Sequence, residues 1–369
     1  MRLTVQLKLQ PTPEQAVALQ RTLERANEAC NYISRVAWEE RTFRQFAIHK
    51  LVYQSVRETF ELAAQMAVRC IAKVADAYKL DKKAQRTFTP HGAIAYDDRI
   101  LSFALPKSEV SIWTLNGRQA IPFVCGERQR QLLASQRGET DLALVDGEWY
   151  LFAVCEVETP EPIDVEGVLG VDLGVTNIAV DSDGEMHSGK AIKNVRYRHR
   201  RLRQKLQRLG TKGSRRLLRR LAGQEKRFAT WVNHNLSKQI VAKAERTKRA
   251  IALEDLTHIR TRVRARRSQR ATLHSWAFFQ LRAFIAYKAV LVGVPVHFVD
   301  PRNTSRTCPA CGCIDKANRK TQASFVCTSC GFAGPADVIA AGNVSRRAPV
   351  SVPHCSDVSL RAGSARAKP

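Results

Sequence analysis

Two cysteine pairs are the most specific chemical signal in the sequence. They occur in CPACG and CTSCG with the spacing Cys-x2-Cys-x15-Cys-x2-Cys, which gives the candidate ligands Cys308, Cys311, Cys327 and Cys330. Each Cys-x-x-Cys turn can offer two thiolates to one ion, and the glycine that follows lets the backbone fold back. Four thiolates are the ligand set of a structural zinc ion, so one Zn²⁺ in a zinc ribbon is predicted. Cys313 is interpreted as a bystander.

Three carboxylates stand where apolar segments end or begin. Asp172 lies in VLGVDLGVTNIAV, Glu254 lies at the end of the strand-like IALED, and Asp337 opens the helix-like PADVIAAGNV. If these acids converge on one face of a sheet, they repel one another unless cations neutralise them. Oxygen ligands suit Mg²⁺, and two such ions about 4 Å apart can activate water and stabilise the leaving oxygen of a phosphodiester. The acids are therefore the candidate catalytic and cofactor-binding residues, with two Mg²⁺ ions.

Each acid also has an ordinary structural explanation when it is taken alone. Asp172 could end a strand, Glu254 could pair with an arginine, and Asp337 could cap a helix. The chain of 369 residues has a net charge of +26, which implies a polyanionic partner, most often nucleic acid. This charge favours the interpretation of the acids as a site that acts on phosphodiesters.

Most of the excess charge lies in residues 190–270, which hold 27 Lys and Arg against 4 Asp and Glu. Tyr197, Phe228 and Trp231 are interleaved with these cations, as suits a channel along nucleic-acid phosphates. An anionic membrane surface is the competing partner, but no apolar run approaches the ~20 residues that span a bilayer. The N-terminus lacks a signal-peptide pattern and the cysteines do not suggest a disulfide framework, so a cytoplasmic protein is expected.

The elements that position these residues are predicted from periodicity and turn signals. Residues 1–10 alternate as a strand, residues 12–84 are expected to be helical from a cap at Thr12, and residues 85–158 are expected to form strands. A hairpin is expected over 167–187, after a linker at Pro160–Pro162. The later elements, in chain order, are basic helices over Arg196–Leu221, a helix over Phe228–Ala250, a strand over 251–256, an apolar helix over Leu273–Val292, a strand over Val294–Val299, a helix over about 337–345, and a disordered tail over 346–369.

The order of these motifs resembles the OrfB/TnpB family of transposon-encoded proteins and, through it, the type V CRISPR effectors. The motifs are, in chain order, GVDLGVTNIAV, IALEDL, TSRTCPACG, CTSCG and DVIAAGNV. The segments WVNHNLSKQIVAKA and FFQLRAFIAYKAVLVGVPVHFVDP are also similar to that family. The resemblance is strong over about 167–345 and fainter over 1–160.

The resemblance implies a multidomain α+β fold. A RuvC-like nuclease domain of the RNase H fold would contain the acids, and a zinc ribbon would be inserted before the third acid. A β-barrel wedge domain would be interrupted by a helical recognition domain. The implied ranges are 167–303 and 335–345 for the nuclease domain, 304–334 for the zinc ribbon, 1–10 and 85–166 for the wedge domain, and 11–84 for the helical domain.

The resemblance also implies a function. Family members bind a guide RNA transcribed from the transposon end, recognise a short motif beside the target, and cut the double-stranded DNA that pairs with the guide. Asp172, Glu254 and Asp337 would be the catalytic triad of such a metal-dependent endonuclease. The helices of residues 190–250 would line the channel for guide and target, and the chain is expected to act as a monomer on RNA.

One position departs from the family pattern. The family usually has Asp-x-Asn-Ala-Ala at the third acid, whereas this chain has Ile339 in the third place, and Gly334-Pro335-Ala336 stands where an Arg or His often occurs. Weakened cleavage with persistent guided binding would give an RNA-guided DNA-binding protein, such as a repressor. An unguided nucleic-acid-binding transposition accessory is the other alternative. The presence of all three acids favours the nuclease.

Overall fold

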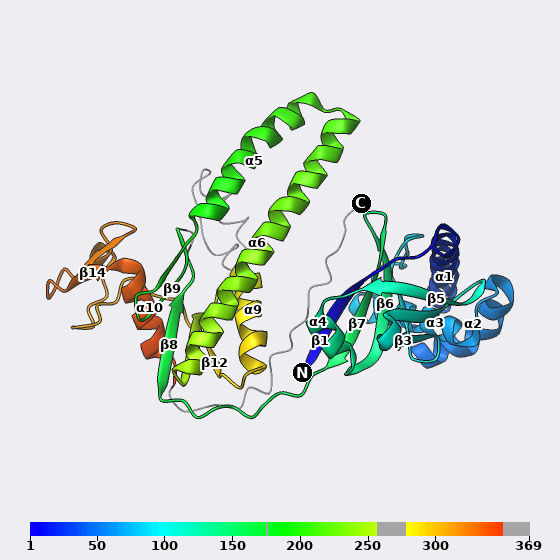
Figure 1. The fold of residues 1–369 in the computed structure, drawn as a ribbon, viewed down its shortest axis with the longest axis horizontal. Helices are drawn as coiled ribbons and strands as arrows, with labels where there is room; N and C mark the ends of the chain where they lie inside the picture. The colour runs from blue at the N-terminus through cyan, green and yellow to red at the C-terminus, as the bar shows by residue number, and fades with distance from the viewer. Residues whose placement is uncertain (175, 257–277, 350–369) are drawn as a thin grey trace. The chain divides into compact units, whose positions relative to one another are not determined.

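The structure is a computed structural model, and it describes residues 1–174, 176–256 and 278–349 (Figure 1). The chain divides into two compact units, Met1–Glu158 and Thr159–Pro369. No helix within the described ranges is long and apolar enough to cross a membrane.

The first unit contains a seven-stranded sheet with antiparallel pairings, in the order β2-β6-β7-β1-β5-β4-β3. Its strands are β1 (Arg2–Leu9), β2 (Ile94–Tyr96), β3 (Leu101–Ala104), β4 (Glu109–Thr114), β5 (Gly117–Val124), β6 (Gln136–Val145) and β7 (Glu148–Glu156). The central β1 buries Val5, Leu7 and Leu9 by alternation, as the sequence predicts. Among the described strands, β2 and β3 are the two ends of the sheet and do not pair with each other, so the closed barrel stays a prediction.

Three helices are inserted between β1 and β2, namely α1 (Pro13–Glu39), α2 (Gln45–Phe60) and α3 (Ala64–Leu80). The predicted start is confirmed, because Thr12 caps α1 and forms a capping box with Gln15. The helical region is divided where Arg41 and Glu61 adopt left-handed backbone angles. Two short helices, η1 (Leu105–Lys107) and α4 (Glu127–Leu133), occur among the later strands and were not predicted. The helices and the sheet share one apolar core.

The second unit is built on a five-stranded mixed sheet in the order β10-β9-β8-β11-β12 (Figure 1). Its strands are β8 (Gly167–Asp172), β9 (Asn177–Asp181), β10 (Met186–Ser188), β11 (Arg249–Glu254) and β12 (Val296–Val299). β9 runs antiparallel to both β8 and β10, which confirms the hairpin predicted over 167–187. β8, β11 and β12 are parallel, so their carboxyl ends lie at one edge of the sheet.

The two faces of this sheet are covered by different helices. Leu169 and Leu253 belong to a core with residues of α6 (Lys212–Arg246) and α9 (Phe278–Val290). The alternate strand residue Ala252 packs instead with residues of α10 (Ala336–Arg347). In Figure 1, α10 accordingly lies on one side of β8 and α6 on the other.

The basic segment forms a two-helix hairpin made of α5 (Lys190–Leu209) and α6. Gly210 ends α5 with a left-handed backbone, at a φ of 62°. Thr211 then caps α6, since its side chain accepts a hydrogen bond from the Ser214 backbone N–H. The predicted separation between Leu221 and Phe228 is wrong, because α6 continues through both residues to Arg246.

The cysteine-rich segment lies between β12 and α10 and contains η2 (Lys316–Asn318), β13 (Ser324–Val326) and β14 (Ala333–Pro335). α10 is slightly longer than predicted, so Arg346 and Arg347 are helical and not part of a tail. The predicted helix start at Leu273 and the tail residues 350–369 lie outside the described residues.

Candidate active site

Asp172 and Glu254 end two neighbouring parallel strands. β8 and β11 pair in register up to Val171 and Leu253, so the two acids are the next residues of the same register. Side chains alternate along a strand, and residues in register on parallel strands point to the same face. For these acids it is the face that α10 covers, because the alternate residues of both strands pack there. The two carboxylates therefore lie together at the carboxyl edge of the sheet.

Asp337 joins this edge from the first turn of α10. Its carboxylate accepts hydrogen bonds from Asn177 Nδ2 at 3.0 Å and from the Arg319 guanidinium at 2.8 Å. The helix can approach β8 because Gly170 has no side chain, and a Cβ there would lie 2.0 Å from the carbonyl oxygen of Ala341. The glycine in VLGVD thus allows the close approach of the helix that carries the third acid.

Burial and neighbouring charges alter the pKa values of two of the acids. Burial, followed by repulsion from Glu254 and Asp337, raises the pKa of Asp172 to about 7. Burial also raises the pKa of Glu254, although the Thr304 hydroxyl donates a hydrogen bond to Glu254 Oε1 at 2.5 Å and opposes this shift. The Arg319 guanidinium lowers both pKa values, and it does not cancel the effect of burial. Negative charge at this edge is thus incompletely neutralised by the chain itself.

The donors at this edge fit hard divalent cations. Carboxylate oxygens are preferred ligands of Mg²⁺, and a bound cation would relieve the repulsion that acts on Asp172. The carboxylate oxygens of the three acids do not form a group in which all lie within 4.8 Å of one another. Among the described His, Cys, Asp and Glu side chains, one group has its ligand atoms within 4.8 Å of one another, and it consists of four cysteines.

The four cysteines predicted as zinc ligands form this tight group. The Sγ atoms of Cys308 and Cys330 are 3.6 Å apart, and those of Cys311 and Cys327 are 3.5 Å apart. The Cys330 backbone N–H donates to Cys327 Sγ, and such backbone hydrogen bonds lower the pKa of the Cys327 thiol to about 6. A group of four thiols that includes an easily formed thiolate fits one structural zinc ion. Cys313 is outside the group, as predicted.

The cysteine-rich segment, which is the candidate zinc ribbon, is packed directly against the helix that carries Asp337. Ile339, the residue that departs from the family pattern, is 8% exposed and shares an apolar cluster with Phe325 and two of the ligand cysteines. From the same ribbon, Arg319 forms the ion pair with Asp337. The ribbon therefore contacts the candidate site through both an apolar cluster and an ion pair.

Three polar residues around the acids were not identified from the sequence. They are Asn177, Thr304 and Arg319. Thr304 begins the TSRTCPACG motif, so its position shortly before the first Cys-x-x-Cys turn could have identified it. Asn177 gave a weaker signal, because an Asn after a turn is common. Arg319 gave none, since it is one cation among many in a basic chain.

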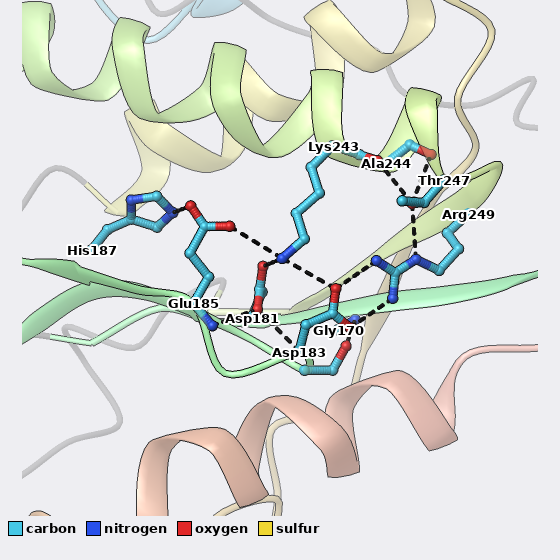
Figure 2. Close-up of polar contacts among 10 residues, drawn as sticks. Gly170, Asp181, Asp183, Glu185, His187, Lys243, Ala244, Thr247 and Arg249 are labelled. Carbon is cyan, nitrogen blue, oxygen red and sulfur yellow. Dashed lines mark hydrogen bonds and ion pairs between the residues drawn. The ribbon is translucent and has the colours of Figure 1, made fainter.

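The opposite face of the same sheet holds a second group of acids, since Asp181 stands opposite Val171 and pairs with Lys243 of α6. Figure 2 shows Asp181, Asp183 and Glu185 around Lys243 of α6 and Arg249 of β11, and these five residues are named the cation clamp. Lys243 Nζ pairs with all three acids, and it lies 3.1 Å from the carboxylates of Asp183 and Glu185. Arg249 donates to both carboxylate oxygens of Asp183, at 2.8 and 2.6 Å. The hydrogen bond from Arg249, together with Lys243, holds the pKa of Asp183 well below its usual range.

Two family models match the chain. Residues 278–344 match the Cas12f1-like TNB domain, and residues 152–258 match OrfB_IS605, described as a probable transposase. The first range contains the four cysteines and Asp337, and the second contains Asp172 and Glu254.

Relatives of two kinds are found. A TnpB-like protein of Methanocaldococcus jannaschii is 30% identical over 198 residues, which cover 50% of this chain and 70% of that protein. The CRISPR-associated endodeoxyribonuclease Cas12f1 of Sulfoacidibacillus thermotolerans is 39% identical over 119 residues, but these cover 27% of that relative's length. The acids, the cysteine group and these matches define a class that comprises TnpB proteins and Cas12f effectors. Within this class, the chain belongs to the TnpB family.

Solved structures agree on the fold. A Cas12f1 chain from a complex with sgRNA and target DNA superposes with a TM-score of 0.60 at 15% identity, over 89% of this chain and 82% of that chain. The mini-RNA-guided endonuclease CRISPR-Cas_phi3 superposes with a TM-score of 0.57 at 12% identity, over 96% and 94% of the two chains. These likenesses show that the chain has the mixed α/β fold of such effectors.

Proposed function

We propose that this chain is an RNA-guided DNA endonuclease of a transposon, which hydrolyses phosphodiesters of guide-paired target DNA. The observation that carries the proposal is the convergence of Asp172, Glu254 and Asp337 at one sheet edge in a chain of the TnpB family. The net charge of +26 supports polyanionic partners, here a guide RNA and double-stranded target DNA with a short flanking motif. Base pairing would recognise the target, while the protein would contact backbones and the flanking motif.

The domain assignment belongs to the same proposal. The mixed sheet with its helices supports a RuvC-like nuclease domain of the RNase H fold over 167–303 and 335–345. The cysteine group supports the zinc ribbon over 304–334. The seven-stranded sheet with inserted helices supports a wedge domain that is interrupted by a helical recognition domain.

The residues at the edge have separate tasks in this mechanism. Asp172, Glu254 and Asp337 would hold two Mg²⁺ ions, which when bound supply an activated water and stabilise the leaving oxygen. Thr304 fixes one oxygen of Glu254. Asn177 and Arg319 donate hydrogen bonds to Asp337 and would orient it, and Arg319 would add positive charge near the phosphates of the cut strand. Burial of the strand holds Asp172 in one position.

The alternative of guided binding without cleavage rests on Ile339. In this structure Ile339 packs with Phe325 of the ribbon, and Asn177 from β9 supplies a polar partner to Asp337. These contacts support a packing role for the substitution and a retained orientation of the acid. They favour the nuclease over the repressor.

The test begins with the RNA. The chain is expressed together with its native flanking DNA, and the RNA that copurifies is sequenced. We expect one discrete RNA that ends in a variable segment, and we expect the complex to cut a matching plasmid in the presence of Mg²⁺. Asp172→Ala should abolish cleavage and leave RNA binding intact.

The alternatives have distinct outcomes. Unchanged cleavage by Asp172→Ala would refute the assignment of the acids. Guided DNA binding without cleavage by the wild type would favour the repressor. Heterogeneous RNA that is removed by salt would favour the unguided accessory.

A further inference from the structure

One face of α6 is an exposed ridge of cations and polar residues that surrounds a single aromatic side chain. Helical periodicity places residues three, four or seven positions apart on one face. The exposed members of this ridge are Arg216, Arg220, Gln224, Arg227, Trp231, Asn235 and Lys238. None of the four cations among them forms an ion pair with another described residue. The ridge is thus strongly positive and contains an indole ring at its centre.

Trp231 is exposed, yet it is held in place. Its side chain is 62% exposed, which is unusual for a large aromatic residue. Its ring is stacked on Phe228, with 6.2 Å between the ring centroids and 23° between the planes. Phe228 itself packs against the core of the second unit. One face of the indole is therefore supported by the fold, and the ring gains little from burial.

Glu225, an acidic residue in this part of α6, pairs with residues of α5 and not with the cations of the ridge. Glu225 pairs with Arg196, His199 and Arg203 of α5 and is mostly buried. These ion pairs join the two helices to each other. The carboxylate is consequently engaged by α5, and it leaves the cations of the ridge available for an external anion.

We propose that the ridge binds RNA, with one unpaired base stacked on the exposed face of Trp231 and the backbone phosphates contacted by Arg227 and Lys238. This inference rests on the proposed function and adds to it the site and mode of an RNA contact. A supported aromatic ring among unpaired cations matches the requirements of single-stranded nucleic acid, which needs a stacking surface and positive charge together. A folded RNA offers unpaired bases in its loops and ends, whereas a DNA duplex keeps its bases stacked inside. RNA is therefore the occupant that fits best.

The test separates stacking from charge. Affinity for the copurified RNA, and for a short single-stranded RNA of mixed sequence, is measured over a range of salt concentrations. We expect Trp231→Ala to lose roughly 5- to 150-fold in affinity, with an unchanged salt dependence, because stacking releases no counterions. Trp231→Phe should retain most of the affinity. Arg227→Gln should reduce the salt slope by about one counterion.

Two controls define the result. Phe46→Ala removes another exposed aromatic ring, 73% exposed, from the first unit and should leave the affinity unchanged. The same RNA annealed to its complement should bind without sensitivity to Trp231→Ala. Since Trp231 is exposed, the melting temperature of each variant should match that of the wild type.

Each other outcome overturns the inference in a distinguishable way. Wild-type affinity in Trp231→Ala, combined with weaker binding by Arg227→Gln, would refute base stacking and leave the proposed function intact. A loss confined to duplex DNA would refute the assignment of the occupant to RNA. A wild-type chain that binds neither RNA would refute both the ridge and the proposed function.

Discussion

The two faces of the mixed sheet carry similar acids in opposite electrostatic states. On the face that α6 covers, the carboxylates of the cation clamp are paired with Lys243 and Arg249, and the pKa of Asp183 is lowered. On the face that α10 covers, Asp172 and Glu254 lie in register at the carboxyl end of their strands, and the pKa values of both are raised. The same sheet thus has one group of acids whose charge is paired within the chain and one group whose charge is incompletely compensated.

The difference distinguishes acids that stabilise the fold from acids that are available for a ligand. A carboxylate that already has its cation in the chain contributes to stability and has little to offer a metal ion. A carboxylate that is buried against other carboxylates costs stability, and it persists where the cost serves a function. The predictions below test this distinction, from the largest expected effect to the smallest.

Removal of zinc should affect the carboxyl end alone. Structural zinc in such four-cysteine sites contributes on the order of 10 kcal/mol of binding free energy, so its loss should unfold the ribbon and release Ile339 and Arg319 from their contacts. We expect a strong chelator followed by excess Mg²⁺ to abolish cleavage. Hydrogen exchange should increase in α10 and stay constant in β10. Full cleavage by the zinc-free protein would contradict this dependence.

Exchange of single acids should produce opposite effects on the two faces. Asp172→Asn should lower the cleavage rate more than about 1,000-fold, because a metal ligand is lost, and it should stabilise the metal-free fold. Asp183→Asn should leave the cleavage rate of the folded protein unchanged. It should lower the free energy of unfolding by about 1 kcal/mol, since this acid is partly exposed. Cleavage assays and chemical denaturation measure the pair. Equal effects of the two substitutions on cleavage would remove the distinction.

The approach of α10 to the sheet should depend on one glycine. In Gly170→Ala the added Cβ would meet the backbone of Ala341 at 2.0 Å, so α10 must move and the free energy of unfolding should fall by about 3 kcal/mol. Gly342→Ala in α10 is the matched control, because its Cβ would have no neighbour within 4 Å. It should stabilise the helix by about 0.5–1 kcal/mol. A neutral Gly170→Ala would mean that the close packing is dispensable.

Loss of the central cation of the clamp should weaken the fold without loss of catalysis. Lys243→Met would leave the buried Asp181 without its ammonium partner, and we expect a destabilisation of about 2–3 kcal/mol. Lys238→Met removes an exposed cation of the same helix, five residues before Lys243, and should leave the stability unchanged. Denaturation curves of the two variants provide the comparison. Similar curves would show that the clamp contributes little.

The pH dependence of stability should come from the carboxyl end. In the folded, metal-free protein the pKa of Asp172 is about 7, whereas an aspartate in the unfolded chain has a pKa near 4. The folded state binds more protons in this interval, so its stability falls as the pH rises through it. Asp183 adds nothing there, because its lowered pKa contributes stability that is lost only below about pH 4. We expect the metal-free wild type, but not Asp172→Asn, to melt a few degrees lower at about pH 8 than at about pH 5.

Spacing within the sequence was enough to predict some parts of the site. The four cysteines are fixed by two tight turns, so their grouping follows from local chemistry. Strand ends placed Asp172 and Glu254 at sheet edges, and parallel pairing of β8 with β11 makes these edges coincide. Asn177 gave only a weak signal and Arg319 gave none, because their contacts depend on how α10 and the cysteine-rich segment approach the sheet. The unbroken α6 was missed, because an exposed amphipathic pattern gives no signal for where a long helix continues.

The length of α6 has a mechanical consequence. Its 35 residues span about 50 Å, and in Figure 1 the α5–α6 hairpin projects past the sheet as an arm. Lys243 anchors this arm near its base, while Trp231 and the cations of the ridge lie further toward the tip. Because the helix is fixed near one end, a force on the free end of the arm exerts a torque at its base. Three carboxylates on one lysine would then serve as the fixed support that keeps this torque from deforming the strands.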